Sequence, residues 1–99
     1  MERIKKLADE IKDELFSAKE YAEEYLTFKA KDNSNWANRY KEMSQDELKH
    51  ADYIHERVVG EIEELQKVYT PPEEMMAKWE KDHKQYIEKA AWIRQMLSM

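Results

Sequence analysis

Two pairs of glutamate and histidine, each three residues apart, carry the strongest chemical signal in this sequence. Glu47 and His50 lie in the stretch EMSQDELKHA, and Glu80 and His83 lie in the stretch EKDH. Side chains three residues apart project from one face of a helix, so each pair directs a carboxylate oxygen and an imidazole nitrogen toward a single point. Carboxylates bridge two ions and imidazole binds one, a mixture that suits iron or manganese. The spacing therefore predicts metal ligands.

Two more glutamates interrupt apolar helix faces in the same way. Read at the helical period of about 3.6 residues, the face that holds Glu47 and His50 also holds Glu61, and the N-terminal stretch places Glu14 on its apolar face. Burying an unpaired carboxylate is costly, so inward-facing acids are neutralised, paired or bound to a cation. A shared metal centre would explain all of them together.

The remaining members of these faces are apolar or aromatic, and we expect them to fill the helix interfaces. They are Ile4, Leu7, Ile11, Ala18, Tyr21, Tyr25 and Phe28 in the first helix, Trp36, Tyr40, Met43, Ile54, Val58, Leu65 and Val68 in the middle helix, and Met76, Trp79, Ile87, Ala90, Ile93 and Leu97 in the last.

Composition predicts the elements that position these residues. The chain has 99 residues, one glycine, two prolines and 39% charged residues, mostly Glu and Lys. Strong helix formers dominate and helix breakers are scarce, so we predict an all-α fold in a single domain, residues 1–99. A chain this short buries a thin core, which favours oligomerisation.

Two clusters of turn and cap residues divide the chain into three helices. KDNSN is a run of turn and N-cap residues, and in YTPPEE Thr70 is predicted as N-cap, Pro71 as the first helical residue and Glu73 as the partner in a capping box. The predicted helices are about 2–30, 34–69 and 71–97, antiparallel and joined by tight turns. Gly60 has no turn residues beside it, so the long middle helix is expected to be continuous.

Charge and composition argue against several classes of protein. A formal net charge of −5 argues against a nucleic-acid-binding protein and against binding to an anionic membrane surface. No apolar run approaches the roughly 20 residues that span a bilayer, and the N-terminal stretch MERIKKLADEIKDE alternates in charge, unlike a signal peptide. We therefore expect a soluble, cytoplasmic protein. Without cysteine, any metal must be held by Glu, Asp and His.

Two of these stretches resemble a known family. DELFSAKEYA is similar to the first helix of rubrerythrin-like and ferritin-like di-iron carboxylate proteins, and EMSQDELKHA is similar to their second-helix Glu-x-x-His-Ala motif. The resemblance implies Glu14 as the first-helix ligand, Glu47 with His50 as one ligand pair, and Glu80 with His83 as the second. The family has four helices where this chain has three.

The family also takes a single glutamate ligand from each of two helices, and Glu14 accounts for only one of them. Spacing suggests Glu61 as the second. Reflecting position 61 through a turn near position 70.5 gives 80, so Glu61 is level with Glu80 on the neighbouring antiparallel helix. At about 1.5 Å per residue, the pair Glu47 and His50 lies about 33 Å from the turn at Pro71 and the pair Glu80 and His83 about 16 Å, whereas two bridged metals lie about 3.5–4 Å apart. One chain therefore cannot bring both pairs together.

A two-fold homodimer can form a site with six ligands in either of two ways, and the sequence leaves both open. If the middle helices cross near Ile54, a four-helix bundle is completed by dimerisation, and each site takes Glu14, Glu47 and His50 from one protomer and Glu61, Glu80 and His83 from its partner. If the axis lies near Glu47, two copies of Glu14, Glu47 and His50 form one interfacial site, as in encapsulated ferritins, and Glu80 and His83 have no ligand role.

Other acidic and histidine residues have simpler interpretations. His55 lies three residues after Asp52, but it flanks the apolar stripe, so we expect it at the surface or behind the ligands. Glu20 belongs to an acidic stretch expected to be solvated, although its depth would let it replace Glu14 if the helix register differs.

The expected function follows from the resemblance. It implies a di-iron centre, with manganese as an alternative metal, that oxidises Fe(II) with dioxygen or peroxide in a ferroxidase-type oxidoreductase reaction. The competing interpretation is a non-enzymatic helical scaffold or interaction module that binds no metal.

Overall fold

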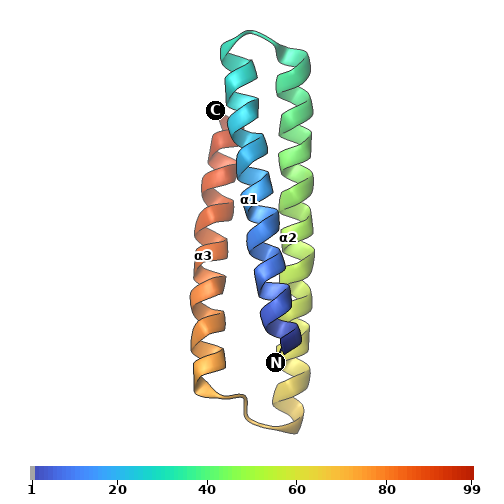
Figure 1. The fold of residues 1–99 in the computed structure, drawn as a ribbon, viewed down its shortest axis with the longest axis vertical. Coiled ribbons are helices and arrows are strands. Elements are labelled where there is room, and N and C mark those ends of the chain that lie inside the picture. Colours follow the sequence, from blue (N-terminus) through green and yellow to red (C-terminus); the bar gives the residue numbers. More distant parts are fainter. Residues whose placement is uncertain (1) are drawn as a thin grey trace.

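The computed structural model describes residues 2–99, which form three helices in a narrow rod of 55 × 17 × 17 Å (Figure 1). Each helix is antiparallel to the next along the chain, so the first and third run in the same direction. They are α1 (Glu2–Ala30), α2 (Ser34–Val68) and α3 (Glu73–Ser98). No strand is present among these residues, so the all-α prediction with a long middle helix is confirmed. Helix α2 runs unbroken through Gly60, as expected. In residues 2–99 no helix has the length and apolar character required to cross a membrane.

The turn between α1 and α2 forms where the sequence predicts it. The Asn33 side chain accepts a hydrogen bond from the Trp36 backbone N–H at 3.2 Å, which caps α2. Asp32 has φ 56°, a left-handed conformation that aspartate tolerates better than most residues. The backbone N–H groups of Lys31 and Asn33 both donate to the Phe28 carbonyl, which closes the end of α1.

The predicted start of α3 is wrong. This helix begins at Glu73 and has Pro72 at its N-cap position, with φ −58° and ψ 141° and no side-chain cap hydrogen bond, so Thr70 and Glu73 do not form a capping box. Two consecutive prolines explain the shift, because a residue before proline is pushed out of the helical region and Pro71 therefore cannot be the first helical residue. Helix α2 ends at Val68, one residue before the predicted boundary.

Small residues let α1 and α2 approach closely. Ala18, Ala22 and Ala51 are fully buried, and so is Ser44, whose hydroxyl donates to the Ala18 carbonyl at 2.7 Å. Helix α3 packs mainly along α1, as Figure 1 shows, and long side chains connect it to α2. The two interfaces form one core that runs along the rod.

The predicted buried face of the middle helix is rotated from the one observed. Trp36, Met43 and Val68 are exposed, and so is Ile87 on α3. Val58 is buried as predicted, but the other buried residues of α2 are Ala37, Ser44, Leu48, Ala51 and Ile62. Close approach to α1 selects the small residues, so the bulky side chains of the predicted stripe lie at the edge of the interface.

Candidate metal site

Three of the predicted ligands converge between α1 and α2. Glu14 lies midway along α1, and Glu47 and His50 lie one turn apart on the adjacent part of α2. One ligand atom from each lies within 4.8 Å of the other two. The His50 Nδ1 atom is 3.5 Å from a Glu14 oxygen and 3.8 Å from a Glu47 oxygen. The set offers two carboxylates and one imidazole from two helices.

The two carboxylates are close enough to alter the chemistry of Glu47. A side-chain hydrogen bond with Glu14 raises the pKa of Glu47 above its usual value, and burial and the negative charge of Glu14 act in the same direction, while His50 opposes them. Two like charges at one point favour a proton or a cation between them. A divalent cation would satisfy both acids at once.

The site opens toward solvent. The side chains of Glu14, Glu47 and His50 are 29%, 23% and 53% exposed. Three protein ligands leave positions on an iron or manganese ion for water, substrate or groups from a second chain. The arrangement is therefore an open site and not a closed structural one.

Aromatic side chains continue the same face toward the α1–α2 turn. Tyr21 lies seven residues after Glu14, and Tyr40 lies seven before Glu47, so each falls on its ligand's side of the helix about 10 Å away. The ring centroids of Tyr21 and Tyr40 are 6.1 Å apart, and Phe28 stacks on Tyr40 at 5.6 Å. Phe28 and Tyr40 are partly buried and pack against the core, so these rings close the helix interface beside the site.

The other predicted ligands lie elsewhere in the chain. Glu61 is 14 residues from Glu47 on α2, about 21 Å along the helix, and its carboxylate lies 3.3 Å from Arg3 and 4.0 Å from Arg57. Glu80 is exposed on α3. A role for Glu61, Glu80 and His83 in a site shared with a partner chain stays a prediction.

The structure also places Glu20 and His55, the two residues for which the sequence suggested simpler roles. Glu20 is exposed on α1 and does not join the group of three ligands. His55 is half-buried, and its Nε2 atom lies 2.7 Å from Nδ1 of His83. The sequence carried a signal for this contact, because reflection through the α2–α3 turn places position 55 level with 86, one turn from 83.

No protein-family model, curated protein or solved structure matches the chain.

Proposed function

We propose that the chain binds iron at Glu14, Glu47 and His50 and that two copies together form a di-iron centre that oxidises Fe(II). The observation that carries the proposal is the convergence of these three side chains from α1 and α2, with one ligand atom of each within 4.8 Å of the other two. Two carboxylates and an imidazole per copy match the donor set that iron and manganese accept in carboxylate-bridged pairs.

Of the two dimers, the geometry favours the one that joins two copies of the same three ligands. In that dimer no ligand has to leave an existing partner, whereas the composite site would draw Glu61 from Arg3 and Arg57 and His83 from His55. The edge that holds the ligands is also the open edge of the α1–α2 interface. A two-fold axis beside Glu47 would bring the paired half-sites together.

The residues have separate tasks in this proposal. Bound iron would supply the electrons that reduce dioxygen or peroxide. Glu14 and Glu47 would hold the two cations and neutralise their charge, and His50 would bind a single ion and leave positions open for the oxidant. Because a metal requires the deprotonated carboxylate, we expect iron binding to weaken as the pH falls through the raised pKa of Glu47.

Iron stoichiometry tests the proposal directly. Metal-free protein titrated anaerobically with Fe(II) should bind two ions per pair of chains, and admitting air should produce ferric absorption in the near ultraviolet. Glu47→Ala should abolish both signals and the increase in melting temperature caused by iron, because the metal stabilises the folded state by mass action. Glu42→Ala changes an exposed acid on the same helix and serves as the matched control.

Two outcomes distinguish the alternatives. Unchanged stoichiometry in His83→Ala would support the dimer of identical ligand sets, and a loss of bound iron would support the composite site. Absence of iron binding, with no oxidation and an unchanged melting temperature, would contradict the proposal and favour a helical scaffold.

A further inference from the structure

A histidine pair connects α2 to α3 at a place separate from the Glu14 site. His55 Nε2 and His83 Nδ1 are 2.7 Å apart, and the two rings have centroids 4.7 Å apart. Trp79 and Tyr86 enclose the pair, with ring centroids 5.6 Å and 4.6 Å from that of His55. Both imidazoles are half-buried, so two helices hold two ring nitrogens toward one point.

The surrounding residues favour the neutral imidazole, which is the form that binds metals. Burial lowers the pKa of His55, and the neighbouring His83 lowers it further, while Asp52 and Glu56 oppose this. In the hydrogen bond between the two rings, one nitrogen donates and the other accepts. When the donor ring carries its proton on its other nitrogen instead, both facing nitrogens have free lone pairs and can bind one cation.

Each histidine also has an acid three residues before it on its own helix. Asp52 precedes His55, and Glu80 precedes His83, so two acid-x-x-His motifs meet at their imidazoles within one chain. Asp52 already accepts a hydrogen bond from Tyr86 and pairs with Arg94 at 3.4 Å. Burial and the hydrogen bond to Asp52 raise the pKa of Tyr86 to about 12, so the phenol remains a donor at neutral pH. Glu80 is exposed one turn before His83 and does not form a close three-residue group with the two imidazoles, so its side chain would have to rotate to become a third ligand.

We propose that His55 and His83 bind one zinc-type divalent ion, an ion that prefers imidazole, at a site between α2 and α3. In a tetrahedral zinc site with Zn–N distances of about 2.0–2.1 Å, two nitrogens lie about 3.3 Å apart. The observed pair therefore has to open by about 0.6 Å, which side-chain rotation supplies. Glu80 or water completes the coordination. The ligand type separates this site from the carboxylate-rich one, and the proposal does not depend on iron binding there.

The test uses the full chain carrying Glu47→Ala, which removes the first site from the measurement. Calorimetry with zinc and visible absorption with cobalt(II) should show one ion per chain. Adding His55→Ala or His83→Ala should weaken zinc binding by about 100-fold or more, because the site loses one of its two imidazoles. Lys84→Ala in the same background changes an exposed residue next to His83 and should leave the zinc affinity unchanged.

A measurement without histidine substitution protects the test against misfolding. Histidine side-chain nitrogen NMR on the Glu47→Ala protein should show zinc-dependent shifts at His55 Nε2 and His83 Nδ1. Unchanged nitrogen signals at both residues would overturn the proposal, as would equal zinc affinity with and without His55. The pair would then be a hydrogen bond that joins two helices.

Discussion

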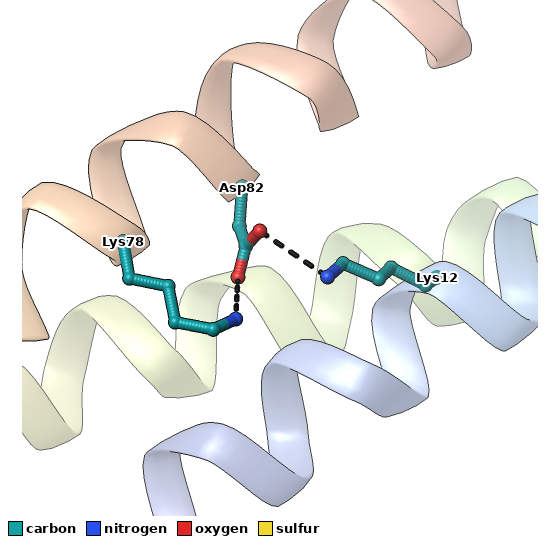
Figure 2. Close-up of polar contacts among 3 residues, drawn as sticks. All are labelled: Lys12, Lys78 and Asp82. Atoms are coloured by element: carbon teal, nitrogen blue, oxygen red, sulfur yellow. Dashed lines mark hydrogen bonds and ion pairs between the residues drawn. The ribbon is translucent and has the colours of Figure 1, made fainter.

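Asp82 shows how one side chain fixes α3 against α1. Its carboxylate lies 3.2 Å from Lys12 of α1 and 3.0 Å from Lys78 of its own helix (Figure 2). Burial acts to raise the pKa of Asp82, but hydrogen bonds and charge from Lys78 and Lys12 outweigh it, so the pKa falls below its usual value of 3.8. Nothing in the local sequence singles out this residue, because the contact with Lys12 exists only after the helices pack.

The low pKa of Asp82 predicts a specific pH dependence. A depressed folded-state pKa means that the ionised carboxylate stabilises the fold above pH 3.8 and that this contribution is lost as the pH falls through the folded-state value. Asp82→Asn should therefore lower the free energy of unfolding by about 1 kcal/mol at pH 7. Urea unfolding at several pH values should show the difference shrinking below pH 4.

The control is Glu88→Gln, which removes an exposed acid from the same helix and should leave stability within about 0.5 kcal/mol of the parent. A difference between Asp82→Asn and the parent that stays constant down to pH 3 would contradict the assignment of the stabilisation to the ionised carboxylate.

At the scale of elements, the length of α2 sets the distances between the candidate sites. Its 35 residues carry Glu47 and His50 in the half near the α1–α2 turn, and His55 follows little more than a turn later. Helix α1 contacts Glu47 and His50 through Glu14, and α3 contacts His55 through His83, so α2 contributes to a candidate site with each of the other two helices. Both candidate sites use residues of α2 that precede Gly60, so a helix break at Gly60 would have left them on one helix.

Gly60 is unfavourable in the interior of α2, and we predict that replacing it stabilises the helix. A Cβ atom added there meets nothing within 4 Å, and glycine in a helix interior costs about 1 kcal/mol relative to alanine. Gly60→Ala should raise the free energy of unfolding by up to about 1 kcal/mol and the melting temperature by about 4–8 °C. Thermal unfolding followed by circular dichroism measures this.

Ala77→Gly, at an exposed position of α3, is the reverse control and should destabilise by a similar amount. A decrease in melting temperature for Gly60→Ala would contradict the prediction.

At the scale of the whole molecule, the rod is thin and leaves large apolar side chains uncovered. Met43 is exposed one turn from Glu47, Trp36 is exposed near the α1–α2 turn, and Phe16 is exposed on the groove between α1 and α3. Met43 lies one turn before Glu47, so a second copy that completes the metal centre would cover it. The proposed dimer thus buries apolar surface and pairs the acids in one event.

This arrangement predicts that iron and dimerisation are linked. Sedimentation should show the molar mass doubling as Fe(II) is added, and Met43→Lys should weaken the iron-loaded dimer by about tenfold or more, since an unpaired cation would be buried at the interface. Phe16→Lys places the same charge on the other exposed face and should leave dimerisation unchanged. An iron-bound monomer would contradict the linkage.

The sequence by itself determined the three helices and most of their ends. Helix formation depends on hydrogen bonds within a few residues and on local caps, so the scarcity of glycine and proline and the cap at Asn33 were sufficient. The wrong start of α3 also has a local cause, because Pro72 keeps Pro71 out of the helical conformation. The motif Glu47-x-x-His50 was visible for the same reason.

Only the tertiary structure decided which side chains meet across helices. The rotation of α2 about its axis is set by the close packing of small residues such as Ala18 and Ser44. Hydrophobicity alone therefore predicted burial for bulky residues that the structure leaves exposed. That rotation brings Glu14 to Glu47 and His50, as the resemblance implied, and brings His55 to His83, which was not expected. Contacts of this kind join residues far apart in the chain, so they depend on the summed packing of whole helix faces and not on any short stretch of sequence.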